Sequence, residues 1–404
     1  MHRNTRIFIT GYGVISAIGV GKDETLRALR QGRSGIGAIE HLRTTHTDLP
    51  SGEVHLTNAQ LAMRAQTGSA TTSRTVMMAV IALREAIEQA RLTADDMRRA
   101  ILLSGTTVGN FDAYEDHFLT LKKQRPEPQH RLFDCGSSTE QLADAFGQWL
   151  LKATVSTACS SAANAFVLGA NLLRSGMADV AVVGGAECIS RFHLNGFNSL
   201  MILDHGQCRP FDACRAGLNL GEGAAYMVLE TGDHARRRGA QPLACLSGYG
   251  NACDAFHQTA TSTDGEGAFL AMRKALRMAG LQPSDIDYVN AHGTGTPDND
   301  ASENRALRRL FGNALPPVSS TKGFTGHTTS ASGAVEAVIC LLALRHAFLP
   351  ANYGFTSPMP DGIVPVAHTE TGRKLRHVLC NSFGFGGNDT SIILSWYTLS
   401  QQHR

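Results

Sequence analysis

The sequence predicts an α/β protein made of two similar halves. Apolar runs typical of strands alternate with helical patterns from the N-terminus onward. A strand leading into a helix of small residues occurs twice, at 152–174 and at 317–346. This repeat indicates a duplication, with one half over 1–240 and the other over 241–404. We find no flexible linker between the halves, so we expect a shared core, and the alternation predicts mainly parallel sheets covered on both faces.

The first half contains five predicted strands and three predicted helices. We expect the strands at 5–15, 100–104, 152–158, 179–184 and 224–230, and the helices at 24–30, 72–90 and 160–174. Asp23 should cap the first helix, because a side-chain oxygen there can accept from a free backbone N–H. Apolar residues show no clear period over 110–138, so we predict no helix or strand there, only a long excursion of the chain between elements.

The second half repeats this alternation after residue 241. We expect strands at 243–250, 287–291, 317–321, 377–382 and 390–396, and helices at 267–279, 301–311 and 330–346. The last two strands should close the second sheet.

Composition excludes several classes of protein. The 37 basic and 35 acidic residues nearly balance, which argues against nucleic acid or an anionic membrane as the main partner. The nine cysteines lack metal-ligand spacings, so we expect free thiols, a reducing compartment and no metal site. No run of 18 apolar residues and no secretion-type leader occurs, which predicts a cytoplasmic protein without a membrane span.

Cys159 lies in TVSTACSSAANAF, at the turn between a strand and a helix of small residues. A helix N-terminus favours a thiolate, and the free backbone N–H groups there can bind an oxyanion. A lone cysteine is otherwise most often a small buried hydrophobic residue.

Two further segments place histidines in loops. NAHGTGTPDND puts His292 directly after a strand, followed by Thr294 and Thr296. SSTKGFTGHTTSASGAVEA puts Lys322 and His327 ahead of the second small-residue helix. By itself, a histidine after a strand is more often a structural residue than a catalytic one, and threonines in such a loop commonly form turns. A lysine and a histidine in a loop, taken alone, indicate little.

A fourth segment, NSFGFGGND, places Phe383 and Phe385 among three glycines. Aromatic residues in such a loop are common at hinges, and they can also gate a pocket.

Together, in this order and spacing, the four segments resemble the elongating β-ketoacyl-acyl carrier protein synthases. The stretches ITGYGVISAIG and CRPFDACRAGLNLGEGAA extend the resemblance over nearly the whole chain. It implies the five-layered αβαβα thiolase fold, with the active site between two duplicated halves. It also implies decarboxylative Claisen condensation of malonyl-acyl carrier protein with a cysteine-bound acyl chain, in fatty acid or polyene biosynthesis.

The resemblance implies a role for each residue of the site. Cys159 would carry the acyl group, His292 and His327 would stabilise the malonyl-derived enolate, and Lys322 would keep both imidazoles neutral. The backbone N–H groups of Cys159 and Phe385 would form the oxyanion hole.

Other matched positions imply supporting roles. Thr294 and Thr296 would bind the pantetheine arm, and Phe385, with Phe383 beside it, would gate the site. Glu303 would be a buried structural acid. No cofactor is implied beyond the phosphopantetheine arm of the carrier protein.

Partners follow from the same resemblance. We expect an acyl carrier protein, which is acidic, to dock on a basic face for which Arg64 and Arg74 are candidates. We also expect a dimer, either with a second copy or with a chain-length-factor homologue. The sequences GFGGND and TPDNDASE depart from the common pattern and are similar to synthases of aryl polyene and flexirubin-type pigment clusters.

Three alternatives are less well supported. A chain-length factor lacks the nucleophile that Cys159 supplies here. A thiolase has a second cysteine in the C-terminal Gly-rich loop, whereas Cys380 precedes that loop. An initiating synthase has Asn in place of His327.

Overall fold

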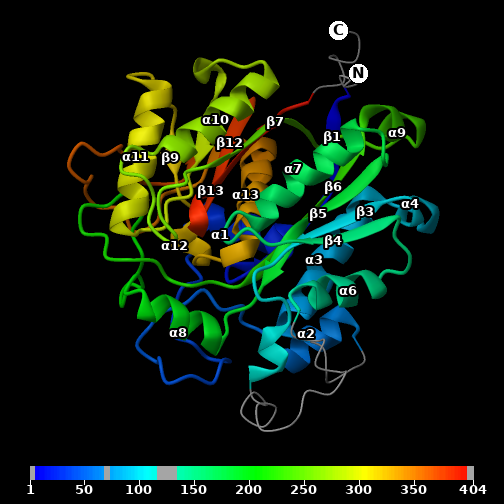
Figure 1. Cartoon of the computed structure of the whole chain (residues 1–404), viewed down its shortest axis with the longest axis horizontal. Coiled ribbons are helices and arrows are strands. Elements are labelled where there is room, and N and C mark those ends of the chain that lie inside the picture. Colours follow the sequence, from blue (N-terminus) through cyan, green and yellow to red (C-terminus); the bar gives the residue numbers. More distant parts are fainter. Residues whose placement is uncertain (1–4, 68–72, 116–133, 398–404) are drawn as a thin grey trace.

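The computed structural model describes residues 5–67, 73–115 and 134–397. Within them, strands of both halves join into one 11-stranded sheet (Figure 1). The first half contributes β1 (Ile7–Ser16), β2 (Gly19–Val20), β3 (Ile101–Gly105), β4 (Leu151–Val155), β5 (Val180–Glu187) and β6 (Gly223–Thr231). The second half contributes β7 (Ala244–Cys253), β8 (Tyr288–Asn290), β9 (Val318–Ser319), β12 (His377–Gly384) and β13 (Asn388–Ser395). A separate pair consists of β10 (Phe348–Leu349) and β11 (Glu370–Thr371).

Strand order repeats between the halves. The first half reads β1-β6-β5-β3-β4 across the sheet, and the second reads β7-β13-β12-β8-β9. β2 lies off this path. When the five remaining strands of each half are numbered in chain order, both halves give the order 1-5-4-2-3, so each half places its first strand beside its last. The two paths meet where Phe8 and Ile9 of β1 pair with Cys245 and Ala244 of β7.

The prediction of mainly parallel strands, in separate sheets, is wrong for the centre of this sheet. From β5 through β6, β1, β7 and β13 to β12, every neighbouring pair is antiparallel. Parallel pairs are confined to the flanks, around β3 and β8. A strand buried on both faces is a continuous apolar run in either direction, so its sequence does not reveal its orientation.

Helices complete five layers. The outer face of the first half is covered by α3 (Arg74–Ala90), and that of the second by α10 (Glu266–Ala279) and α11 (Pro297–Phe311). Between the two sets of strands lie α7 (Ser161–Arg174) and α13 (Ser332–His346) (Figure 1). Residues 332–344 of α13 are all buried, as a helix at the centre of a layered core must be.

Most predicted elements are present, with shifted ends. Gly21, not Asp23, caps α1 (Lys22–Gln31), and Asp23 lies in its first turn, where a carboxylate is favourable. α11 begins four residues before its predicted start, because Pro297 is compatible with the first turn of a helix. The strand predicted to reach residue 158 ends at Val155, and Ala158 has a left-handed φ of 51°.

In the described part of the chain, six helices are present that were not predicted: α2 (Asn58–Ala65), α4 (Ala94–Arg98), α6 (Gly136–Asp144), α8 (Arg191–Ser199), α9 (Gly232–Arg237) and α12 (Lys322–Thr325). Of the excursion at 110–138, residues 116–133 lie outside the described part. None of the helices in the described part is long and apolar enough to cross a membrane.

Candidate active site

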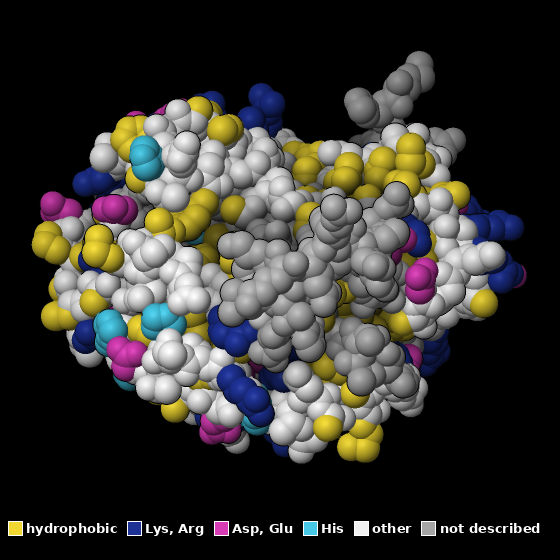
Figure 2. Space-filling view, turned by 60° about the horizontal axis from the view of Figure 1, so that its bottom comes forward, with side chains coloured by type: hydrophobic (Ala, Val, Ile, Leu, Met, Phe, Trp, Pro, Cys, Tyr) yellow, Lys and Arg dark blue, Asp and Glu magenta, His cyan; other side chains and the backbone are white. Residues whose placement is uncertain are grey.

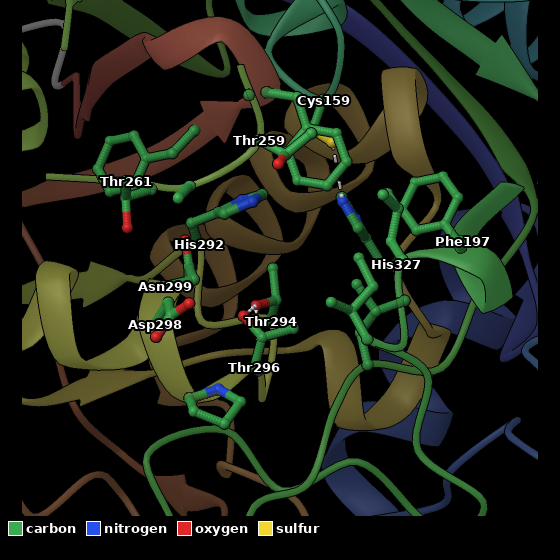
Figure 3. A pocket seen from close by; sticks show the side chains of 18 of the residues that line it. Cys159, Phe197, Thr259, Thr261, His292, Thr294, Thr296, Asp298, Asn299 and His327 are labelled. Atoms are coloured by element: carbon green, nitrogen blue, oxygen red, sulfur yellow. Dashed lines mark hydrogen bonds between the residues drawn. The ribbon is translucent and has the colours of Figure 1, made fainter. Parts of the chain in front are cut away.

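The four segments singled out in the sequence meet at one cavity of about 460 Å³ (Figure 3). The first half contributes Cys159, from the turn before α7, Phe197 of α8 and four residues that follow α8, whereas the second half contributes the remaining residues. The residues relevant here are Cys159, Phe197, His292, Thr294, Thr296, His327, Phe383 and Phe385. The cavity therefore lies between the two halves.

A sharp turn presents Cys159. Ala158 has a φ of 51°, and its carbonyl accepts from the Ser161 hydroxyl at 2.6 Å, while that hydroxyl accepts from the Thr157 N–H at 2.9 Å. Gly384, at the end of β12, lies so close that a side-chain Cβ there would be 3.2 Å from the Cys159 nitrogen. Glycine at 384 thus lets the Gly-rich loop approach the backbone of the nucleophile.

His327 contacts Cys159 directly. Its Nε2 lies 3.1 Å from the Cys159 sulfur, shown as a dashed line in Figure 3. Its backbone N–H donates to the Asn219 carbonyl at 2.8 Å, and its own carbonyl accepts from Gly221 at 2.9 Å. The loop before α13 is therefore anchored to the segment that precedes β6.

His292 is held by Lys322. The Lys322 ammonium lies 3.2 Å from His292 Nδ1 and 2.5 Å from the His292 carbonyl oxygen. The rings of His292 and His327 are 5.3 Å apart, nearly perpendicular, and both extend into the cavity. Because Nδ1 faces an ammonium, the proton of neutral His292 resides on Nε2, which can then donate to a ligand.

The sequence analysis missed Glu336. Its Oε1 accepts from the Lys322 ammonium at 2.5 Å, and both side chains are almost fully buried. Burial raises the pKa of Glu336, although the nearby Lys322 lowers it. The signal was present in the sequence, because Glu336 is the single charged residue in the apolar stretch from Gly333 to Leu344 of α13.

Both histidines are neutral. Burial, followed by the positive charge of Lys322, lowers the pKa of His292 and of His327 well below the ordinary value. Two neutral imidazoles at one cavity can donate or accept hydrogen bonds without introducing charge.

The expectation that the Cys159 thiolate is favoured is wrong for this structure. Burial raises the pKa of Cys159 to about 11 and outweighs the opposing effects of Lys322 and of the backbone N–H groups of Phe385 and Cys159. The thiol therefore needs a proton acceptor at neutral pH, and His327 is in hydrogen-bond contact with it.

Phe383 and Phe385 occupy different environments. Phe383 is buried, with its ring 5.8 Å from that of His292. Phe385 is half-buried and stacks on Phe197 of α8 at 5.9 Å. Phe385 therefore lies on the side of the cavity that is formed by α8.

The remaining predicted residues also lie nearby. The hydroxyls of Thr294 and Thr296 are 2.8 Å apart and line the cavity beyond the histidines. Glu303 accepts from the backbone N–H groups of His292 and Gly293 at 2.9 and 2.8 Å. Burial raises the pKa of Glu303 to about 7.

One of the two basic candidates is misplaced. Arg74 is only 7% exposed and forms an ion pair with Glu222 at 2.6 Å, so it cannot dock a partner. Arg64 is exposed near the end of α2. On the face shown in Figure 2, Lys and Arg side chains form several separate groups with acidic side chains between them.

Comparison with protein families gives two matches that together span most of the chain. Residues 4–235 match the model of the beta-ketoacyl synthase N-terminal domain, and residues 243–356 match that of the C-terminal domain. A 3-oxoacyl-[acyl-carrier-protein] synthase 2 of Rhizobium meliloti is 34% identical over 97% of this chain and 99% of its own length. Nodulation protein E of the same organism is also 34% identical, over 96% of this chain and 98% of its own.

Solved structures agree with these matches. The ishigamide ketosynthase/chain length factor superposes with a TM-score of 0.90 at 33% identity, covering 98% of this chain and 100% of that one. A ketosynthase in complex with its chain length factor, from Xenorhabdus doucetiae, gives 0.82 at 32% identity, covering 97% and 98%. With its five layers, repeated strand order and these relatives, the chain belongs to the beta-ketoacyl synthase family and has the thiolase fold.

Proposed function

We propose that the chain is a β-ketoacyl-acyl carrier protein synthase in which Cys159 carries the growing acyl group. The observation that carries this proposal is the 3.1 Å contact between His327 Nε2 and the Cys159 sulfur, with His292 facing the same cavity. The half at 1–240 then supplies the nucleophile, and the half at 241–404 supplies the histidines and Lys322.

Acylation comes first. His327 accepts the thiol proton as the Cys159 sulfur attacks the carbonyl carbon of an acyl thioester. The sulfur–carbon bond to pantetheine breaks, and the leaving thiolate takes a proton. An acyl-enzyme and a free carrier thiol result.

Decarboxylation follows when a malonyl thioester binds. As its carbon–carbon bond to the carboxylate breaks, carbon dioxide leaves and the electron pair moves onto the thioester as an enolate. Neutral His292 and His327 donate N–H bonds to the enolate oxygen, while Lys322 keeps both rings uncharged. This use of His327 requires that, once the leaving thiolate has been protonated, the neutral ring carries its one remaining proton on Nε2.

Condensation completes the cycle. The enolate carbon attacks the Cys159 thioester, and the backbone N–H groups of Cys159 and Phe385 stabilise the resulting oxyanion. Collapse expels the Cys159 thiolate and releases a β-ketoacyl thioester lengthened by two carbons. Thr294 and Thr296 hold the pantetheine arm, and Phe385 gates the site beside Phe383. The substrates arrive on phosphopantetheine, so the reaction uses no resident cofactor.

We further propose that the chain works in the cytoplasm with an acyl carrier protein and as a dimer. β4 lies at one end of the sheet, with Leu150 and Leu151 of this edge 52% and 39% exposed. An exposed edge of this kind can continue a sheet into a second subunit. The two similar structures described with a chain length factor favour a heterodimer over a homodimer.

The alternatives are weaker. A chain-length-factor role does not need Cys159 or its contact with His327. For thiolase chemistry, Cys380 would have to act as the second cysteine, but it is 2% exposed in β12 and does not line the cavity. An initiating synthase is disfavoured by the histidine at 327.

The direct test is condensation of an acyl-pantetheine thioester with malonyl-pantetheine, followed by mass spectrometry of both product and enzyme. We expect a β-ketoacyl product and a transient acyl adduct on Cys159, and neither for Cys159→Ala. Cys214→Ala, which removes an exposed thiol away from the cavity, is the matched control. Product formation by Cys159→Ala would refute the proposal.

A further inference from the structure

A buried acid directly follows the Gly-rich loop. Asp389 is the second residue of β13 and is 3% exposed. It pairs across the sheet with Phe383 of β12 on one side and Ala252 of β7 on the other. Among the described residues no Lys or Arg forms an ion pair with it, and the charged groups that act on it are the acids Asp254 and Glu303. A buried carboxyl group in such surroundings is costly to ionise.

Asp389 and Asp254 both lie next to Gly267, in the first turn of α10. A Cβ on Gly267 would lie 2.2 Å from Asp389 Oδ2 and 2.8 Å from the Asp254 Cβ. The two acids therefore share a space that exists only because residue 267 has no side chain.

Asp254 connects the Gly-rich loop to the wall of the cavity. Its backbone N–H donates to the Gly387 carbonyl at 2.7 Å, and its carboxylate accepts from the N–H groups of Ser262 and Gly267 at 2.5 and 3.1 Å. A second tie joins the Gly386 N–H to the Gln258 carbonyl at 2.8 Å. The segment at 255–261 between these ties contributes Thr259, Ala260 and Thr261 to the cavity wall.

We propose that Asp389 is a positioning residue: its neutral carboxyl group lets Asp254 hold the loop of Phe385, and its ionisation loosens that loop. The inference rests on the proposed function, because the Phe385 N–H is then the oxyanion donor. If Asp389 ionised, two negative charges would lie next to Gly267. The hydrogen bonds made by Asp254 are the nearest contacts that can break in response.

Electrostatics support this geometry. Burial first, and then Asp254 and Glu303, raise the pKa of Asp389 to about 8. The other charged groups of α10 near this site are engaged elsewhere, since Lys274 donates to the Asn251 carbonyl and Glu266 pairs with Arg309. The acid is therefore neutral at pH 7 and ionised above pH 8.

The kinetic test compares wild type with Asp389→Asn, which keeps the shape and cannot ionise. Asp264→Asn, which removes an exposed carboxylate from the neighbouring loop, is the matched control. Enzyme already acylated on Cys159 is mixed with malonyl-pantetheine, and single-turnover condensation is followed from pH 6 to 10. With a pKa of about 8, the neutral fraction of Asp389 falls about tenfold between pH 7 and 9, and we expect the wild-type and Asp264→Asn rates to fall with it. Asp389→Asn should stay within about twofold over that interval. An equal fall in Asp389→Asn, or no fall in wild type, would overturn the proposal.

Thermal unfolding tests the titration without any activity. Folded wild type holds a proton on Asp389 that the unfolded chain releases at the ordinary aspartate pKa, so its stability falls as pH rises from about 4 to 8. The midpoint of Asp389→Asn minus that of wild type should therefore grow up to pH 8 and then stay constant. A constant difference from pH 5 to 9 would refute the ionisation of Asp389. If the midpoint difference grows with pH but neither wild type nor any variant catalyses condensation at any pH, the ionisation of Asp389 is supported and the proposed function is refuted.

Discussion

His327 Nε2 lies 3.1 Å from the Cys159 sulfur, which joins a turn of the first half to a loop of the second. Burial raises the pKa of that thiol to about 11, so in the proposed reaction this contact would provide the proton acceptor for acylation. The contact itself forms only where the two halves pack against each other.

The reactivity of Cys159 should depend steeply on pH. With a pKa of about 11, the thiolate fraction rises about tenfold per pH unit up to pH 10, and alkylation by a small reagent such as iodoacetamide should follow it. The measurement is mass spectrometry of the Cys159 peptide over time from pH 7 to 10. N-acetylcysteine is the reference, and a rate that levels off below pH 9 would contradict the burial argument.

Cys159→Gln should separate the two halves of the reaction. Its carboxamide oxygen can occupy the oxyanion hole as an acyl carbonyl would, so the variant should convert malonyl to acetyl carrier thioester without condensation. Adding His292→Ala or His327→Ala should lower this residual decarboxylation about 100-fold or more, as loss of an oxyanion-hole donor does. Carrier-bound acetyl is measured by mass spectrometry against a no-enzyme control. Condensation by Cys159→Gln would show that another residue is the nucleophile.

Phe385→Ala should uncouple acylation from malonyl binding. The ring stacks on Phe197, so its loss opens the α8 side of the cavity while Cys159 keeps its turn. We expect a clear fall in condensation with acylation retained, measured by separate single-turnover assays. Unchanged kinetics in both assays would mean that Phe385 only packs.

Arg74→Met should destabilise the fold. The substitution leaves the buried Glu222 carboxylate without its partner, which costs about 3–5 kcal/mol in comparable buried pairs. Urea unfolding measures the change, and Arg64→Met, at an exposed position, should stay within about 0.5 kcal/mol of wild type. A cost below about 1 kcal/mol for Arg74→Met would show that Glu222 finds another partner or a proton.

Arg64→Glu tests the surviving basic candidate. If Arg64 helps to dock an acidic carrier protein, reversing its charge should raise KM for carrier-bound substrate about tenfold at low salt and leave KM for pantetheine analogues unchanged. Steady-state kinetics with both substrates decide this. Equal changes for both would place the docking face elsewhere.

Local patterns were enough to predict most of the elements. The apolar runs located the ten strands β1, β3–β9, β12 and β13, although β8 and β9 are shorter than predicted. The repeated strand and small-residue helix indicated the duplication. Strand direction was not predicted, because a strand buried on both faces, such as β6, has no pattern that differs between parallel and antiparallel neighbours. Short helices such as α8 were missed because nine residues with only two buried positions give too few apolar residues to show a helical period.

The sequence by itself determined which side chains could do chemistry, since Cys159, His292, Lys322, His327 and the Gly-rich loop all occur in motifs with characteristic spacing. Only the tertiary structure decided their protonation states and their charged partners. Burial made the Cys159 thiol a weak acid and both histidines neutral, paired Lys322 with Glu336, and turned Arg74 from a surface candidate into a buried structural ion pair. A pKa depends on desolvation and on charges brought together from distant parts of the chain, and neither is encoded in local sequence.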